Sequence, residues 1–253
     1  MTIMINVRGK FIPAAQNNGT RGTKNVPQIC RICNIALKNS AAYFAVPAKK
    51  EAEMTDFNIT DRVDTVLFTD TSANLTPPLA KGISIIPLAY SIEGKEQHQD
   101  PQTDFDGHAY YERIRAGAQV STSMINPDAF KNAFTKALSQ GKDVLYIGMS
   151  GGISGTAQAA FCAAAELREQ YPERTIITVD TLAASLGEGL QVLKAVQMLD
   201  SGCSLAAVAE MLESTRHKMC QYFMVDDLIH LRKGGRISGI AARVGTLLGI
   251  KPI

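Results

Sequence analysis

The 253-residue chain is predicted to be an α/β protein with a largely parallel sheet. Short apolar runs bounded by turn residues alternate with segments of helical periodicity, which is the pattern of βαβ units. Hydrophobic residues make up 45% of the chain and charged residues 20%, close to the usage of globular proteins. No stretch approaches the roughly 18 consecutive apolar residues of a membrane-spanning helix. We therefore expect a folded protein with a sizeable core.

Charge and cysteine usage narrow the class of protein. Residues 1–60 hold eight Lys and Arg against three Asp and Glu, whereas residues 61–253 hold 18 against 21. A mildly acidic folded part argues against a general nucleic-acid binder. The five cysteines are odd in number, and the apolar start breaks off at Arg8 before a secretory signal could form. A cytoplasmic protein with reduced thiols is expected.

Residues 1–60 differ from the rest of the chain. The polar, turn-rich stretch 17–25 has no period, so we predict an atypical and disordered N-terminal extension, with Met54 as an alternative start. Cys30 and Cys33 form a CxxC motif, but a zinc site would require a second pair of ligands. We interpret the motif as incidental and expect no metal site.

From residue 63 the pattern becomes regular. Two apolar runs, 63–70 and 83–90, predict buried strands. A helix is expected after Asn126, a preferred N-cap residue, with Pro127 in its first turn and Gly141 beyond its end.

The alternation continues along the second half of the chain. The expected elements are a strand over 143–149, a helix over 157–170, a strand over 175–180, and two helices that contain 186–196 and 205–212. These elements complete the βαβ pattern.

Small hydroxyl side chains gather where predicted strands end. One segment, 120–127, contains Thr122 and Ser123, and another, 148–156, contains Ser154 and Thr156; a third, 70–75, is similar. Ligands of open parallel sheets bind beyond the carboxyl ends of the strands, and helix N-termini attract anions. We interpret the first two segments, both placed after strands of one sheet, as an anion site. The alternative is that these hydroxyls only cap helices.

A serine hydrolase is the alternative function. The stretch 148–152 fits the G-x-S-x-G nucleophile elbow, with Ser150 as the nucleophile. A triad would then require Asp180 or Asp200 as the acid, and His217 or His230 as the base. The short motif contains three glycines and is weak evidence.

A cationic glycine turn lies at 231–238. It contains Arg232, Lys233 and Arg236 next to Gly234 and Gly235. The turn is either a solvated loop or a docking surface for an anionic partner, because glycine permits close backbone approach and cations steer encounter.

Taken together, these segments resemble the DegV family, the bacterial fatty-acid-binding proteins. The resemblance covers about residues 63–253, in order and with close spacing. The matching segments are Thr69–Leu75 (TDTSANL), Gly82–Leu88 (GISIIPL), Thr122–Ser123, Ser150–Ala160 (SGGISGTAQAA), Val179–Thr181 (VDT) with Gly187 and Gly189, Val225–Leu228 (VDDL) with Leu231–Ser238 (LRKGGRIS), and Leu247–Ile253 (LLGIKPI).

The resemblance implies a lipid-binding subunit that is not itself an enzyme. It implies two α/β domains that hold one long fatty acid between them and present it to a separate kinase, which makes an acyl-phosphate for phospholipid synthesis. The residues implied to bind the carboxylate are Thr122, Ser123, Ser154, Gly155 and Thr156. Arg232, Lys233 and Arg236 are implied to contact the kinase. No catalytic residue, metal or cofactor is implied.

The resemblance also implies the domain organisation. Residues 61–218 correspond to the first domain, and residues 219–253 to the start of a second, smaller α/β domain that is incomplete here. Family members continue beyond the final Lys-Pro-Ile segment, through a part that contributes a further histidine near the carboxylate. We therefore expect that the C-terminus is truncated. Residues 1–60 have no counterpart in the family.

Overall fold

The computed structural model describes residues 2–7, 10–13, 64–100, 103, 105–224, 228–235 and 237–238. The chain divides into two compact units. The larger unit is Ile59–Met219, and the other combines Met1–Asn58 with Cys220–Ile253. The candidate carboxylate-binding residues all belong to the larger unit.

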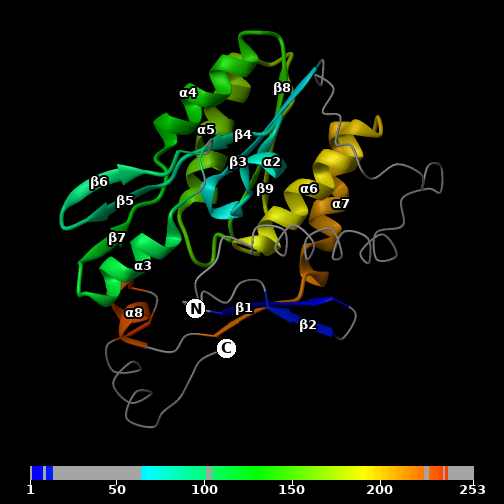
Figure 1. Cartoon of the computed structure of the whole chain (residues 1–253). Coiled ribbons are helices and arrows are strands. Elements are labelled where there is room, and N and C mark those ends of the chain that lie inside the picture. Colours follow the sequence, from blue (N-terminus) through cyan, green and yellow to red (C-terminus); the bar gives the residue numbers. More distant parts are fainter. Residues whose placement is uncertain are drawn as a thin grey trace. The chain divides into compact units, whose positions relative to one another are not determined.

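A parallel four-stranded sheet forms the centre of the larger unit, in the order β4-β3-β8-β9 (Figure 1). These strands are β3 (Thr65–Asp70), β4 (Ser84–Ile86), β8 (Asp143–Gly148) and β9 (Ile176–Asp180). The pairing aligns Phe68 with Tyr146, and Gly148 with Asp180. The carboxyl ends of β3, β8 and β9 therefore lie along one edge of the sheet.

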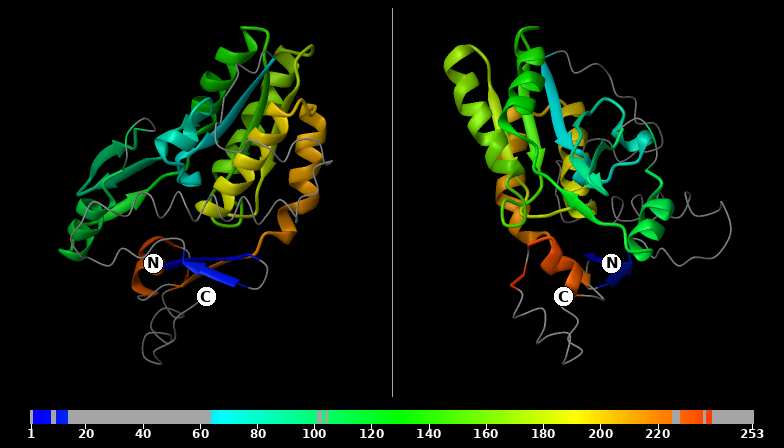
Figure 2. Two further views of the ribbon diagram at one scale, coloured as in Figure 1. Left: turned by 45° about the vertical axis from the view of Figure 1, so that its right-hand side comes forward. Right: turned by 90° about the vertical axis from the view of Figure 1, so that its left-hand side faces the viewer.

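Helices cover both faces of this sheet (Figure 2). Helices α4 (Pro127–Leu138) and α5 (Thr156–Gln170) pack on one face, and α6 (Leu186–Asp200) and α7 (Leu205–Thr215) on the other. Strand β8 shows the alternation that this requires, since successive side chains of a strand point to opposite faces. Val144 and Tyr146 join the cluster under α4 and α5, whereas Leu145 and Ile147 join the cluster under α6 and α7. The predicted α/β fold class is confirmed.

The predicted start of α4 is also confirmed. The side chain of Asn126 accepts a hydrogen bond from the backbone N–H of Ala129 at 2.8 Å, and Pro127 is the first helical residue. Gly141 follows the helix with a φ of 75°, a left-handed conformation that glycine adopts without strain.

A separate antiparallel sheet was not predicted. It has the order β6-β5-β7 and consists of β5 (Ala89–Ile92), β6 (Lys95–His98) and β7 (Val120–Thr122). The prediction of one strand over 83–90 is wrong, because the run divides at Pro87 into β4 and β5. Proline has no N–H to donate to a ladder, and the chain leaves the parallel sheet there.

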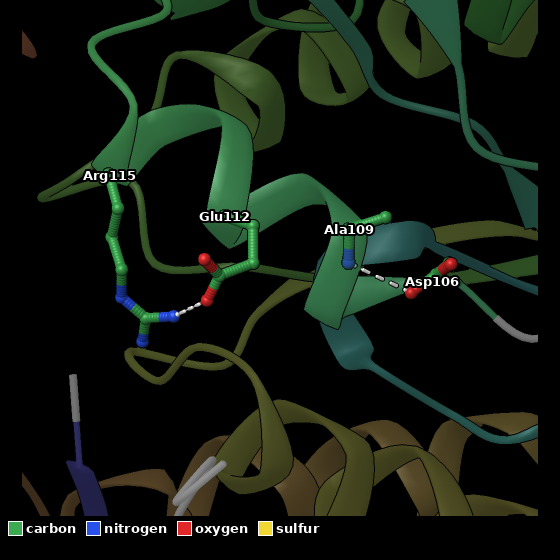
Figure 3. Close-up of polar contacts among 4 residues, drawn as sticks. All are labelled: Asp106, Ala109, Glu112 and Arg115. Carbon is green, nitrogen blue, oxygen red and sulfur yellow. Dashed lines mark hydrogen bonds and ion pairs between the residues drawn. The ribbon is translucent and has the colours of Figure 1, made fainter.

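Helix α3 (Gly107–Arg115) lies between β6 and β7 along the chain. Asp106 caps it by accepting a hydrogen bond from Ala109 N at 3.0 Å, and Arg115 forms an ion pair with Glu112 one turn earlier (Figure 3). No residue of α3 is buried. Its half-buried face consists only of Gly107, Tyr110 and Ile114, a stripe too narrow to be a strong sequence signal.

Three short elements complete the larger unit. Two of them, η1 (Thr71–Ala73) and α2 (Pro77–Ala80), follow β3, and η2 (Arg216–Lys218) follows α7. None of the helices that the structure describes combines the length and apolarity needed to cross a bilayer.

The smaller unit contains an antiparallel sheet in the order β10-β1-β2. Its elements are β1 (Thr2–Val7), β2 (Lys10–Pro13), β10 (Gln221–Met224) and α8 (Leu228–Lys233). Strands β1 and β2 differ from the disorder expected for residues 1–60. The alternation of Ile3, Ile5 and Val7 is a strand pattern that the polar stretch after it obscured. Cys30 and Cys33 lie outside the described residues.

Candidate functional site

The structure brings the two predicted hydroxyl segments together. Thr122 is the last residue of β7, and Ser154 lies in the turn between β8 and α5. The backbone N–H of Ile125 donates to Thr156 Oγ1 at 3.4 Å, which joins the two segments. Thr156 Oγ1 in turn lies 2.9 Å from Ser154 Oγ. One continuous set of hydrogen bonds therefore runs from the residues after Thr122 to Ser154.

The five predicted carboxylate-binding residues divide into two groups by exposure. Thr122, Ser123 and Gly155 are exposed and Ser154 is half-buried, so a ligand can reach them. Thr156 is fully buried, and its hydroxyl bonds both Ile125 and Ser154. Thr156 therefore links the two segments and holds them in register.

The prediction of the sheet that positions the Thr122 segment is wrong. The prediction placed both after strands of one parallel sheet, but β7 belongs to the antiparallel sheet. Tyr90 of β5 pairs with Thr122, and the N–H of Ser123 donates to the carbonyl of Ala89 at 3.2 Å. The strand is interrupted at Pro87, so β5 leaves the parallel sheet and pairs with β7. This pairing places the Thr122 segment near the turn that follows β8.

The electrostatics of the 148–156 segment, which leads into α5, suit an anion. Helix α5 begins at Thr156, and its first turn contains no acidic residue. The N–H of Thr156 donates to Ser154 Oγ at 3.2 Å. The unpaired N–H groups of a helix start carry a partial positive charge, and hydroxyls add donors that turn toward a carboxylate.

Exposed apolar side chains flank the hydroxyls, and sequence reasoning missed them. Met124 is 53% exposed and Ile153 is 45% exposed. A Cβ at Gly155 would lie 2.6 Å from Met124 Sδ, so the glycine leaves room for this side chain over the start of α5. Single apolar residues in a polar turn have no period, which is why no sequence signal marked them.

The neighbouring turns are held by Asp180. Its carboxylate accepts from Gly151 N at 3.0 Å and from Leu182 N at 2.9 Å. Arg216 Nη1 donates to the carbonyl of the same residue at 3.1 Å. Asp180 therefore fixes the turns that follow β8 and β9 relative to each other.

The third hydroxyl segment, 70–75, points inward. Asp70 and Thr71 are buried, and Ser72 binds the carboxyl groups of Asp70 and Glu188. The Ser72 hydroxyl is therefore engaged by buried carboxyl groups and does not add to the exposed hydroxyls of the other two segments.

The geometry does not support a serine hydrolase. Ser150 Oγ accepts a hydrogen bond from Gly152 N at 3.2 Å, and the described residues give it no histidine partner. Asp180 is occupied by backbone N–H groups, and His217 is exposed in η2. The serine therefore stabilises its own turn.

The predicted docking residues fall at the end of α8. Arg232 and Lys233 are exposed, and Arg236 lies outside the described residues. Within the part of the chain that the structure describes, no group of three or more His, Cys, Asp or Glu side chains converges as metal ligands would.

Comparison with known proteins gives consistent matches over the same part of the chain. A family model described as "Uncharacterised protein, DegV family" matches residues 64–253. A DegV domain-containing protein of Clostridium perfringens is 40% identical over 190 residues, which are 74% of this chain and 65% of the relative. A relative from Deinococcus radiodurans is 36% identical over 190 residues, again 74% and 65% of the two chains. This chain thus spans about two thirds of the length of these curated relatives.

Solved structures agree with these matches. A DegV family protein from Thermus thermophilus, described as fatty acid binding, is 35% identical with a TM-score of 0.62, over 75% of this chain and 66% of the other. DegV from Bacillus subtilis, described as a fatty acid binding protein, is 27% identical with a TM-score of 0.62 and the same coverage.

Proposed function

Because this chain belongs to the DegV family, we propose that it binds a long-chain fatty acid and presents it to a partner kinase. The carboxylate is held by the hydroxyls of Thr122, Ser123 and Ser154 and by the backbone at Gly155, with Thr156 as the link between the segments. The observation that carries the proposal is the hydrogen-bonded junction of the two segments through Ile125 and Thr156. The chain acts as a binding subunit, and the kinase performs the catalysis.

The energetics of the proposal depend on both ends of the ligand. Removing about 15 methylene or methyl groups from water contributes roughly 12 kcal/mol at about 0.8 kcal/mol each, before association costs. The carboxylate loses hydration when it binds, and hydroxyl and N–H donors offset that loss. Hydroxyl and backbone donors of the described site residues, rather than a buried cation, favour reversible release, which a presenting protein needs.

A cytoplasmic location is part of the proposal. The thiols of Cys162, Cys203 and Cys220 form no disulfide among the described residues. Free thiols are usual in a reducing compartment.

Ligand extraction and two substitutions test the binding proposal. Solvent extraction and mass spectrometry of the purified protein should yield a fatty acid. Thr122→Ala and Ser154→Ala should each weaken palmitate binding by about 1–3 kcal/mol, because each leaves a carboxylate oxygen without a donor.

The matched control is Ser121→Ala. Ser121 precedes Thr122 on β7, and its hydroxyl lies 2.8 Å from that of Ser91, on the opposite face of the strand. This variant should bind palmitate as the unaltered protein does. If no fatty acid is extracted and added palmitate or oleate does not bind, the proposal fails.

The kinase part of the proposal rests on Arg232 and Lys233, the exposed cations at the end of α8. Replacing both with alanine should leave palmitate affinity unchanged and should reduce acyl-phosphate formation when a fatty acid kinase is added. The reason is that exposed cations steer an anionic partner without touching the ligand. Equal loss of binding and of acyl-phosphate formation would contradict a docking role.

A further inference from the structure

Two carboxyl groups from distant parts of the chain meet inside the larger unit. Asp70 ends β3 and Glu188 lies in the first turn of α6, and the two residues are 1% and 0% exposed. Ser72 Oγ bridges them, in contact with Asp70 Oδ1 and 2.7 Å from Glu188 Oε2. A Cβ at Gly189 would lie 2.6 Å from the carbonyl oxygen of Ala73, so this glycine lets α6 approach η1 closely enough for the contact.

The hydroxyl groups around this pair contain too few hydrogens for two ionised carboxylates. Thr69 Oγ1 contacts the carbonyl oxygen of Ile147 at 2.8 Å and Glu188 Oε1 at 3.3 Å, and Ser72 Oγ contacts one oxygen of each carboxyl. Each hydroxyl has one hydrogen, so Ser72 Oγ can donate to only one of the two carboxyl groups that it contacts. A proton on the other carboxyl lets that group donate to Ser72 Oγ and accounts for both contacts.

The donors around each carboxyl show which one carries that proton. Burial raises the pKa of Asp70 above its ordinary value of 3.8. Three donors oppose that rise by stabilising the ionised group, namely Ser72 N at 2.8 Å, Ser72 Oγ, and the hydroxyl of Tyr146 at 2.7 Å. Among the described residues, Glu188 has only the hydroxyls of Thr69 and Ser72 as hydrogen-bond partners. The hydrogen bonds then run from Glu188 Oε2 to Ser72 Oγ, and from Ser72 Oγ to Asp70 Oδ1.

The surroundings agree with a neutral Glu188. The titratable groups that face it are Asp70 from β3 and Tyr146 from β8, and among the described residues no Lys, Arg or His forms an ion pair with either carboxyl. Burial raises the pKa of Glu188 well above its ordinary value of 4.5, and the charge of Asp70 raises it further. Lys194, the cation of α6, lies six residues further along the helix and donates to Gln197.

We propose that Glu188 carries a proton in the folded chain and that, as the donor to Ser72, it positions the η1 turn, to which the Thr122–Ser123 segment is linked through Leu88 and Ala89. Thr71, next to Ser72, accepts from the N–H of Leu88 at 3.0 Å. Leu88 precedes Ala89, whose carbonyl accepts from Ser123 N. Glu188 is thus a positioning residue for the Thr122–Ser123 segment, and this second half of the inference rests on the proposed function.

The first test measures folding stability against pH in the wild type and in Glu188→Gln. The glutamine amide can donate to Ser72 as the protonated acid does, but it does not ionise. A group that is neutral when folded and ionised when unfolded contributes stability that is full below pH 4.5 and falls as pH rises toward its folded pKa. The folding constant of the variant relative to the wild type should therefore rise about tenfold per pH unit between pH 4.5 and the folded pKa of Glu188, and should be constant above it.

The matched control is Glu210→Gln, at an exposed glutamate of α7. The ratio of its folding constant to that of the wild type should stay constant over the same pH range. A constant ratio for Glu188→Gln as well would overturn the proposal. Carbon-13 NMR of the Glu188 carboxyl in the wild type gives the same answer without a variant, and an ionised signal at pH 7 would refute the assignment.

The second test concerns positioning. With the fluorescent fatty acid cis-parinaric acid as the probe, Glu188→Ala should weaken binding about tenfold or more, and Glu188→Gln should restore it to within about twofold of the wild type. Equal binding by all three proteins overturns the positioning role. If the wild type itself does not bind the probe, the proposed function fails, while the stability ratio still decides where the proton resides.

Discussion

At the scale of the residue, the Tyr146 hydroxyl is the donor that a single substitution removes most cleanly. The ring packs against Phe130 and Phe134 in the core under α4, with centroid separations of 4.9 and 6.2 Å. Tyr146→Phe keeps this packing and removes only the donor to Asp70 Oδ2. We expect the free energy of unfolding to fall by about 1–3 kcal/mol, since a buried charged acceptor loses a partner.

Urea denaturation measures this loss, with Tyr171→Phe as the control. Tyr171 is half-buried beside the same cluster, and its hydroxyl makes no hydrogen bond to another described residue. The control should change the unfolding midpoint little. Equal stability of both variants would show that Asp70 does not depend on Tyr146.

Single residues also show what a sequence can predict. Asn126 was identifiable because an N-cap acts within three residues of the helix that it starts. Glu188 was not, because its partners are more than 115 positions away, as the separation of 116 from Ser72 shows. A glutamate in the first turn of a helix is ordinarily read as an exposed residue that favours the helix dipole. Only the tertiary fold reveals that it is buried.

At the scale of the element, local periodicity predicted the parallel sheet and its helices, but not the antiparallel sheet. The strands β3, β8 and β9 are buried on both faces and appear as continuous apolar runs. Strands β6 and β7 have mostly exposed side chains, so neither an apolar run nor strict alternation marks them. The hydroxyls of Thr122 and Ser123 were recognised, but as a loop, because a strand of three residues, two of them exposed, has no signal of its own.

At the scale of the whole molecule, the larger unit contains a complete core of its own. Both hydrophobic clusters, one on each face of the parallel sheet, are built from residues within 59–219. A domain of about 160 residues buries roughly 70% of the surface that its unfolded chain exposes, enough for independent folding. The candidate carboxylate site and the Asp70–Glu188 pair are also within this unit.

We therefore predict that residues 59–219, expressed alone, unfold in urea in one cooperative transition, with a midpoint within about 1 M of that of the whole chain. The reason is that no residue of either hydrophobic cluster is removed. The control is a shorter fragment, 59–203, which lacks α7 and with it Val208 and Leu212, both fully buried against α6 and the sheet. That fragment should lose cooperativity, because the face of the sheet that α7 covers becomes exposed to water. A gradual transition for 59–219 would contradict the prediction and would mean that the larger unit depends on the rest of the chain for its stability.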